Sequence, residues 1–303
     1  MTFYAPPPVI RTEVYATLPK KYRGSGKRST WYNRHPGIEC FLEGPAFDRH
    51  GNLYFVDIPH GPIFRMAPNR EIELVTEYDG EPGGLKIHRD GRIFVTDYKH
   101  GIVVLDPESG KTSPFTAINI SENFKGLNDL VFTRNGDLYF TDQGKSSLHD
   151  PSGRVFRYSA EGRLECLLNN CPSPNGIVLN PQESTLYVGV TRANAVWMAP
   201  LEKDGNVGKV GLYSQLPGMG GPDGMAMDAE GNLSVVQVGS GVVWLLNRKG
   251  LPVYRIDSCC GDAITNLAYG GKDNKTLFIL GSTSGTIVTA ELPVAGQPMF
   301  SHA

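Results

Sequence analysis

One short pattern recurs six times along the chain, and it constrains the fold more than any other feature of the sequence. Each copy has a polar turn followed by a run of aromatic and β-branched residues, and the copies lie at 48–57, 89–97, 134–142, 181–189, 228–236 and 272–280. Successive copies are roughly 40 to 48 residues apart, which is the length of a four-stranded propeller blade. The sequence therefore predicts an all-β protein, a six-bladed β-propeller with four antiparallel strands in each blade.

The strands of each blade can be placed around its turn. An innermost strand is expected just before the turn and a second strand just after it, and a third β-branched or aromatic run follows in every copy. Fourth strands are expected in the first five copies, at 74–78, 114–118, 164–168, 212–216 and 253–256. The 36 glycines and 22 prolines agree with many short strands joined by tight turns.

The sixth copy lacks a fourth strand, because after Leu292 the chain continues through Pro293 and Pro298. A matching segment lies at the other end of the chain, where residues 14–19 resemble residues 212–217. We expect 14–19 to be a closing strand paired onto the last blade, so that residues 1–303 form a single propeller domain. Closure of this kind removes an exposed sheet edge.

The connection after the closing strand, residues 20–38, is much longer than those of the other blades. It contains six basic residues and no acidic residue. A loop of this length in a compact domain is either a lid over a functional site or a mobile segment, and the sequence leaves both readings open. The cations favour an anionic substrate beneath a lid, although a solvated loop explains them equally well.

Counting eight residues back from the turn glycine of each copy, or from Glu183 in the fourth copy, brings four oxygen-bearing side chains into register. They are Glu43, Asn128, Asn175 and Asp223. The second copy has Gly83 at this position, and the sixth has Asn266 only if a slip of one residue is allowed. In a propeller this position begins the innermost strand, beside the central axis on one face.

Each of these residues alone would be assigned to a turn, since Asn and Asp are common turn residues. Four of them in equivalent register favour a shared site instead. Two carboxylates and two amide oxygens suit one hard divalent cation such as Ca²⁺, Mg²⁺ or Mn²⁺ better than a soft metal. The two negative charges would neutralise such an ion, and open positions would remain for water or substrate.

The residues around these positions are similar to those of a known family. The segments concerned are Phe-Leu-Glu-Gly-Pro at 41–45, Phe-Val-Asp-Ile-Pro at 55–59, Leu-Asn-Asp-Leu at 127–130, Ser-Pro-Asn-Gly at 173–176 and Gly-Pro-Asp-Gly at 221–224. Together they resemble the family of senescence marker protein (regucalcin), gluconolactonase and luciferin-regenerating enzyme, over roughly residues 40–292. The resemblance implies a six-bladed propeller that holds a single catalytic divalent metal through Glu43, Asn128, Asn175 and Asp223.

The resemblance also implies an activity. Family members are mostly lactone hydrolases, so we expect a metal-dependent lactonase, of the gluconolactonase kind, that acts on a small-molecule lactone. We expect Ca²⁺ as the metal, with Mg²⁺, Mn²⁺ or Zn²⁺ as alternatives. Asp223 is the expected catalytic residue, as general base or as nucleophile, whereas Glu43 is expected to be a ligand only. The alternatives are an organophosphate or aryl-ester hydrolase of the same fold, and a non-catalytic propeller that binds a metal or another ligand.

The sequence indicates substrate-binding residues less clearly than it indicates the metal ligands. Sugar lactonases of the family carry an arginine two places before the first asparagine, and this chain has Gly126 there, which argues against a simple aldonolactone. Asp57, Asp97 and Asp142 end second strands on the metal-binding face, where turn capping explains them at least as well as substrate contact. The remaining candidates are two histidines that could carry a proton and two aromatic residues of the long loop, namely His60, His149, Trp31 and Tyr32.

The composition and the N-terminus limit the partners and the compartment. The formal net charge of −2 offers no general attraction to nucleic acid or to an anionic membrane. No apolar run approaches the roughly 20 residues that span a bilayer, and residues 1–8 lack the features of a signal peptide. We expect a cytoplasmic protein without nucleic-acid or membrane partners, and the sequence leaves the oligomeric state open.

Overall fold

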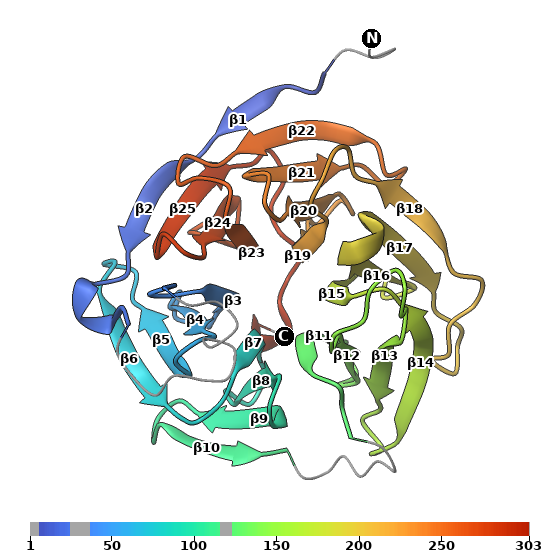
Figure 1. Cartoon of the computed structure of the whole chain (residues 1–303), viewed down its shortest axis with the longest axis horizontal. Helices are drawn as coiled ribbons and strands as arrows, with labels where there is room; N and C mark the ends of the chain where they lie inside the picture. The colour runs from blue at the N-terminus through green and yellow to red at the C-terminus, as the bar shows by residue number, and fades with distance from the viewer. Residues whose placement is uncertain (1–5, 25–36, 116–122, 303) are drawn as a thin grey trace.

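Six small sheets form a ring around a central axis in the computed structural model, which describes residues 6–24, 37–115 and 123–302 (Figure 1). Each sheet contains four antiparallel strands in sequence order from the axis outwards, apart from the contributions of the N-terminal segment. The predicted six-bladed propeller is therefore confirmed. Among the described residues, no helix has the length and apolar character needed to cross a bilayer.

The first three blades use strands that follow one another directly along the chain. Blade one contains β3 (Leu42–Phe47), β4 (Leu53–Asp57), β5 (Pro62–Met66) and β6 (Ile72–Glu77). Blade two contains β7 (Pro82–Ile87), β8 (Ile93–Asp97), β9 (Gly101–Asp106) and β10 (Lys111–Pro114). Blade three contains β11 (Leu127–Phe132), β12 (Leu138–Asp142), β13 (Gly153–Tyr158) and β14 (Leu164–Cys171).

The other three blades continue the same order. Blade four contains β15 (Pro174–Leu179), β16 (Thr185–Val190), β17 (Ala195–Pro200) and β18 (Gly211–Gln215). Blade five contains β19 (Pro222–Met227), β20 (Leu233–Gln237), β21 (Val242–Leu246) and β22 (Pro252–Asp257). Blade six contains β23 (Ile264–Gly270), β24 (Thr276–Gly281) and β25 (Thr286–Glu291). Three short 3₁₀ turns lie at η1 (Lys20–Tyr22), η2 (Thr191–Ala193) and η3 (Phe300–His302).

The N-terminal segment closes the ring. Strand β2 (Glu13–Thr17) pairs antiparallel with β25 and gives blade six its fourth strand, as predicted. Strand β1 (Val9–Arg11), which the sequence did not predict, pairs in parallel with β22 and adds a fifth strand to blade five. The N-terminal segment thus joins the last two blades along their outer edges (Figure 1). Two strands of one segment on two neighbouring blades oppose separation of those blades.

The apolar core lies between the faces of neighbouring blades. Side chains of β-strands alternate between two faces, so each blade offers apolar residues to both of its neighbours. Phe47 of blade one meets Phe278 of blade six edge to face, with ring centroids 4.9 Å apart. Phe94 of blade two meets Phe132 of blade three in the same way, at 5.2 Å. These aromatic pairs pack between neighbouring blades, close to the turns that join the innermost strand of each blade to its second strand. We call the face of the ring that carries these turns the turn face.

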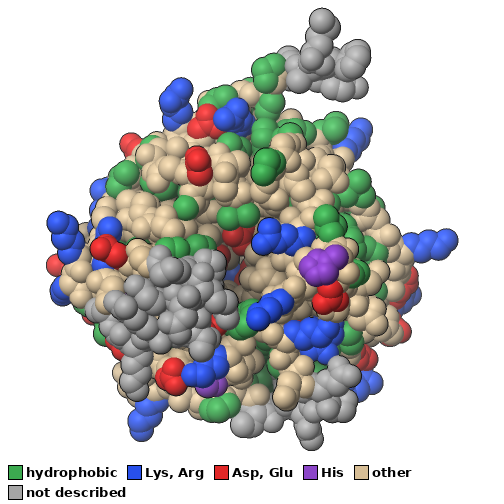
Figure 2. Space-filling model, in the orientation of Figure 1, with side chains coloured by type: hydrophobic (Ala, Val, Ile, Leu, Met, Phe, Trp, Pro, Cys, Tyr) green, Lys and Arg blue, Asp and Glu red, His purple; other side chains and the backbone are tan. Residues whose placement is uncertain are grey.

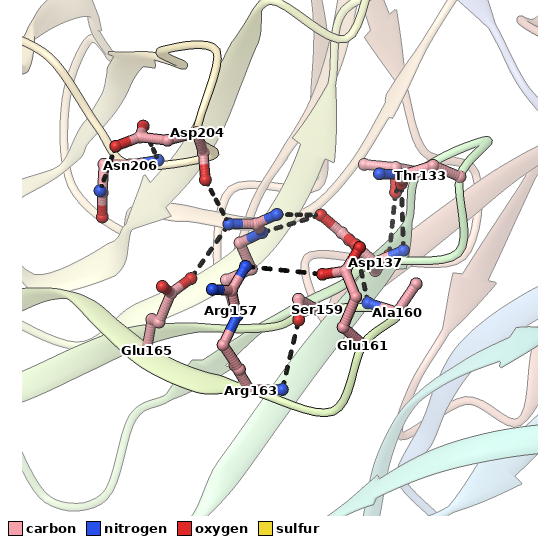
Figure 3. Close-up of polar contacts among 11 residues, drawn as sticks. Thr133, Asp137, Arg157, Ser159, Ala160, Glu161, Arg163, Glu165, Asp204 and Asn206 are labelled. Atoms are coloured by element: carbon pink, nitrogen blue, oxygen red, sulfur yellow. Dashed lines mark hydrogen bonds and ion pairs between the residues drawn. The ribbon is translucent and has the colours of Figure 1, made fainter.

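A buried ion-pair network adds a polar connection between blades three and four (Figure 3). The Arg157 guanidinium, whose side chain is 8% exposed, donates through Nε to Asp137 Oδ2 at 2.8 Å and through Nη1 to Glu165 Oε2 at 3.0 Å. Its Nη1 also donates to the carbonyl oxygen of Asp204, in the loop that precedes β18 of blade four, at 2.7 Å. The second oxygen of Asp137 accepts the Ala160 N–H at 2.9 Å. Arg157 thereby connects the turn that contains Asp137 with the loop of blade four that contains Asp204, and Asp137 in turn binds the turn that contains Ala160.

The C-terminal tail, residues 295–302, crosses the turn face of the ring and contacts every blade. Gly296 forms a bridge with Asp228 of blade five and donates its N–H to the carbonyl oxygen of Asn274 of blade six at 2.8 Å. The Gln297 side chain donates to the carbonyl oxygen of Leu179 of blade four at 3.1 Å. The tail therefore ties blades four, five and six together after the last strand has ended.

The end of the tail reaches the other three blades. The Phe300 ring stacks on Phe132 of blade three with centroids 5.0 Å apart, and the Arg89 guanidinium of blade two lies over it at 4.7 Å. The Ser301 carbonyl accepts a hydrogen bond from Arg49 Nε of blade one at 2.5 Å. The chain terminus consequently lies at the centre of the ring (Figure 1).

The tail also lines a cavity of about 110 Å³ inside the ring. Residues 297–301 form one wall, and each innermost strand contributes one residue at equivalent register, namely Ala46, Lys86, Val131, Val178, Ala226 and Ala268. Most residues that line the cavity are apolar, and Lys86, Gln297 and Ser301 are polar. Sequence patterns did not predict this role for the tail, because the tail forms no strand.

We predict that deletion of residues 296–303 lowers the thermal unfolding midpoint by about 5 °C or more, because contacts to all six blades are lost together. Phe300→Ala should account for part of the loss, at about 2 kcal/mol of unfolding free energy for a half-buried aromatic ring. Leu251→Ala, which truncates a residue that is 58% exposed, serves as the control. A truncated chain that melts with the full-length chain would contradict the role of the tail.

Candidate functional site

Every innermost strand has a β-bulge near its start. The pairing of the innermost strand with the second strand shifts register at equivalent places in all six blades, between residues 43–46, 82–85, 127–130, 174–177, 222–225 and 264–267. A bulge bends the strand and redirects a side chain, and bulges often occur beside functional sites. The residues identified by counting back from each turn all lie at these bulges.

The pairing of the innermost and second strands identifies the residues that occupy equivalent positions in the six blades, independently of any count from the turns. In each blade the last residue of the second strand pairs with a residue of the innermost strand, as Asp142 pairs with Leu127. The next residue along is Glu43, Gly83, Asn128, Asn175, Asp223 or Thr265 in blades one to six. Thr265, and not Asn266, therefore occupies the sixth position, and the one-residue slip allowed for Asn266 is not needed.

Glu43 and Asp223 approach each other across the axis. Each is almost completely buried, at 8% and 6% exposure. Burial raises the pKa of both carboxyls above the ordinary range, and for Asp223 the negative charge of Glu43 is the second cause. Asn266 Nδ2 donates to Glu43 Oε2 at 2.8 Å, and the Asn175 side chain donates a hydrogen bond to Asp223. Four blades thus meet at this pair of acids: blades one and five supply the acids, and blades four and six supply the two asparagines.

Threonine hydroxyls hold the backbone of these bulges. Thr141 Oγ1 of blade three donates to the carbonyl oxygen of Asn175 of blade four at 2.8 Å. The same contact joins Thr96 to Asn128 and, with distances of 2.8 Å, Thr191 to Pro222 and Thr265 to Leu42. Each hydroxyl links one blade to the innermost strand of the next blade, so contacts between blades fix the backbone that carries the candidate site residues. Sequence reasoning missed these threonines.

Asp129 is a further acidic residue near the axis that sequence reasoning did not single out. It follows Asn128 in the chain and is 1% exposed. Its charge raises the pKa of both Glu43 and Asp223. Lys86 Nζ, 3.7 Å from Asp129 Oδ1, supplies the nearest positive charge. The carboxyl after Asn128 in the Leu-Asn-Asp-Leu segment was the one available sequence signal.

The donor set fits a hard divalent cation. Within residues 6–24, 37–115 and 123–302, no lysine, arginine or histidine forms an ion pair with Glu43 or Asp223, and the positive charge of Lys86 only partly offsets the effects that raise the pKa of Glu43. Two buried acids without a cationic partner are costly unless a metal or a proton neutralises them. In the same described part of the chain no group of three or more His, Cys, Asp or Glu could hold a metal ion, so such a site must use the amides of Asn128 and Asn175.

Asp142 binds backbone and side-chain groups of its own blade. Its carboxylate is fully buried, and Oδ1 accepts the N–H groups of Lys125 and Gly126 at 2.7 and 2.9 Å. Oδ2 accepts a hydrogen bond from Arg154 Nε at 2.7 Å. Both oxygens are therefore used within blade three, as the turn-capping alternative predicts. Asp97 binds the Glu81 N–H at 2.9 Å in the equivalent place, which agrees with the turn-capping alternative.

The two predicted histidines lie in different environments. His60 is completely buried, and its backbone N–H is bonded to the Asp57 carbonyl oxygen. His149 is exposed, and its Nδ1 lies 2.7 Å from Ser147 Oγ, in the loop between β12 and β13. Neither has a described contact with Glu43 or Asp223. Trp31 and Tyr32 lie outside the described residues, as does most of the 20–38 loop.

Gly126 cannot be replaced by a larger residue without rearrangement. Its φ of +143° is disfavoured for other residues, and a side chain there would overlap the Tyr98 ring. Glycine at this position is thus required by the local backbone and by its aromatic neighbour.

Charged side chains surround the centre of the face shown in Figure 2. Lys, Arg and His side chains gather beside the centre, and acidic side chains show close to it (Figure 2). The basic side chains supply positive charge near the rim of a site that contains two acids.

Comparisons with known proteins agree with this geometry. A family model described as the SMP-30/Gluconolactonase/LRE-like region matches residues 41–283. Lactonase drp35 of Staphylococcus aureus strain USA300 is 34% identical over 226 residues, which cover 71% of this chain and 69% of the relative. A lactonase drp35 of Staphylococcus saprophyticus is 32% identical over 228 residues, with the same coverage.

Two solved structures have the same fold. A calcium-binding protein, regucalcin, from Agrobacterium tumefaciens strain C58 has a TM-score of 0.78 at 18% identity, covering 98% of this chain and 99% of that protein. A gluconolactonase from Xanthomonas campestris has a TM-score of 0.74 at 19% identity, covering 93% and 99%. At these identities the likeness concerns the fold alone.

We predict that Asp142→Asn lowers the free energy of unfolding by about 2–4 kcal/mol, because it removes the charged partner of the buried Arg154. The measurement is denaturant unfolding, with Asp150→Asn, at an exposed position of the same loop, as the control. A variant with unchanged stability but a raised KM would instead assign Asp142 to substrate binding.

Proposed function

The chain belongs to the SMP-30/gluconolactonase/LRE-like family, and we propose that it is a lactone hydrolase that depends on one divalent cation. The observation that carries the proposal is the set of four oxygen-bearing side chains at equivalent bulges of four blades, two of them buried acids without a cationic partner. Relatives named lactonase, at 34% identity over most of both chains, support the reaction class.

Glu43, Asn128, Asn175 and Asp223 are the proposed ligands. Carboxylate and amide oxygens are hard donors, and Ca²⁺ accepts six to eight of them in flexible geometry. Ca²⁺ is our first choice, and a structural neighbour described as a calcium-binding regucalcin supports it. Mg²⁺, Mn²⁺ and Zn²⁺ are the alternatives. The charge of a bound cation would also lower the raised pKa values of both acids and keep them ionised.

The reaction follows from these residues. When bound, a divalent cation would polarise the lactone carbonyl and stabilise the negative charge that develops on its oxygen. Asp223 accepts a proton from the attacking water as the water oxygen bonds to the carbonyl carbon, and it returns a proton to the ring oxygen when the ring C–O bond breaks, so that a hydroxy acid is released. In the alternative, Asp223 attacks the carbonyl itself and water releases the acyl group. Asn175, which donates a hydrogen bond to Asp223, orients the carboxylate for either step.

We propose a substrate class that is broader than the sugar lactones. Gly126 leaves no place for an arginine, because of its φ of +143° and the adjacent Tyr98 ring. A positively charged contact to sugar hydroxyls is therefore absent from this position. An organophosphate or aryl ester remains the second candidate substrate class, since the same cation would polarise a phosphoryl or ester oxygen.

A panel of substrates tests the proposal. Aldonolactones, aliphatic lactones, an aryl ester and an organophosphate are offered to the full chain with added Ca²⁺, and acid release is followed with and without a chelator. We expect hydrolysis of at least one lactone, lost on chelation and restored by the cation. Hydrolysis that survives chelation would contradict metal dependence. Cation binding without hydrolysis of any substrate would favour a non-catalytic propeller.

We predict that Asp223→Asn lowers kcat by at least about 10³-fold while much of the cation affinity remains, because an amide still supplies an oxygen ligand but cannot accept a proton. Glu43→Gln, the matched substitution at the other acid, should weaken cation binding more than it lowers kcat at saturating cation. The measurements are kcat and calorimetric Kd for both variants. Undiminished turnover by Asp223→Asn would exclude its catalytic role.

A further inference from the structure

We propose that Gln143 is a positioning residue that turns the Asn128 amide oxygen towards the axis and couples it to the segment that carries Asn175. This inference rests on the proposed function, since it concerns two of the four proposed ligands. Gln143 directly follows the end of β12 and lies outside the equivalent bulge positions that hold the four proposed ligands.

The direct contact fixes one end of the Asn128 amide. Asn128 Nδ2 donates a hydrogen bond to Gln143 Oε1, with the two atoms 3.2 Å apart. An asparagine amide has a donor end and an acceptor end, and rotation by half a turn exchanges them. With the nitrogen held by Gln143, the oxygen is the free end. A cation requires that oxygen, so the acceptor at position 143 selects the useful orientation of the ligand.

The orientation of Gln143 is fixed in turn by its surroundings. Its backbone N–H donates to the Gly126 carbonyl oxygen at 2.9 Å, and its own carbonyl oxygen accepts a hydrogen bond from Ser146 Oγ at 2.6 Å. Its side-chain Nε2 donates to Ser173 Oγ at 3.0 Å. Both ends of the Gln143 amide are therefore used, and the hydrogen-bond direction runs from Asn128 through Gln143 to Ser173.

Ser173 is a backbone position under strain, two residues before Asn175. Its φ of +67° is in the left-handed region, which costs free energy for a residue other than glycine. Three hydrogen bonds hold it there. The Ser173 N–H donates to Ser146 Oγ at 3.0 Å, its carbonyl oxygen accepts the Thr191 N–H at 2.9 Å, and its Oγ accepts from Gln143. Gln143 thus contacts one ligand directly and stabilises the backbone that places another.

Two substitutions of Gln143 should have different effects on the Asn128 amide. Methionine matches the length of glutamine but has no strong acceptor, so the Asn128 amide would rotate freely and Ser173 would lose one support. Glutamate keeps an acceptor for Asn128, and the Ser173 hydroxyl can donate to its second oxygen. Partners that orient metal ligands typically change metal affinity by about 10- to 100-fold when they are removed.

The test measures Ca²⁺ binding to the full chain by calorimetry. We expect Gln143→Met to weaken the Kd by at least about tenfold, and Gln143→Glu to keep it within about threefold or to tighten it. Thermal midpoints are recorded in chelator, so that a loss of fold is separated from a loss of binding. Gln215→Met, at an exposed glutamine of β18, is the matched control and should bind as the parent does.

Each remaining outcome decides against the inference in a different way. Unchanged affinity in Gln143→Met would overturn it while the metal site stood. Equal weakening by methionine and glutamate would show that the acceptor is not what matters. Failure of the parent chain to bind any of Ca²⁺, Mg²⁺, Mn²⁺ and Zn²⁺ would contradict the proposed function, and this inference would fall with it.

Discussion

The repulsion between two buried carboxyl groups at the axis is the physical constraint on which the rest of the site depends. Glu43 and Asp223 come from blades one and five. Burial raises the pKa of both carboxyls, the negative charge of Glu43 raises the pKa of Asp223 further, and Asp129 adds a third negative charge nearby. Lys86 offers only a distant, partial compensation. Burial of such groups is unfavourable in the absence of a cation, so the ring must supply stability from elsewhere in order to hold them together.

That stability comes from contacts between blades. Threonine hydroxyls bind the innermost strand of the next blade, and the glycines that follow Glu43, Asn175 and Asp223 allow neighbouring strands to approach. A Cβ at Gly224, for example, would overlap the Asn266 side chain. On the opposite face the C-terminal tail joins all six blades, and at the outer edge β1 and β2 join blades five and six. The site is thus held by the closed ring rather than by one blade.

The sequence predicted the features that repeat, and it predicted the closing strand because residues 14–19 resemble a segment of blade four. Features without a counterpart elsewhere in the chain were missed. The six turns and the equivalent positions of Glu43, Asn128, Asn175 and Asp223 were readable because a propeller reuses one unit. The pairing of Val9–Arg11 with β22 and the docking of Phe300 were not, because each depends on a partner far away in the sequence. The sequence assigned Asn266 to the sixth equivalent position only by allowing a slip of one residue. The strand pairing assigns Thr265 to that position, and Asn266, the next residue, donates a hydrogen bond to Glu43. Asp142 could not be assigned until its burial and its bond to Arg154 were known.

Diffraction from crystals soaked in Mn²⁺, recorded so that the anomalous signal of manganese is measured, tests the central claim most directly. We predict one strong peak on the axis, within about 2.0–2.6 Å of an oxygen atom from each of Glu43, Asn128, Asn175 and Asp223. The peak should disappear in Asp223→Ala crystals that keep the same fold. An axis without a peak at saturating Mn²⁺, or a peak bound by a different set of residues, would contradict the account.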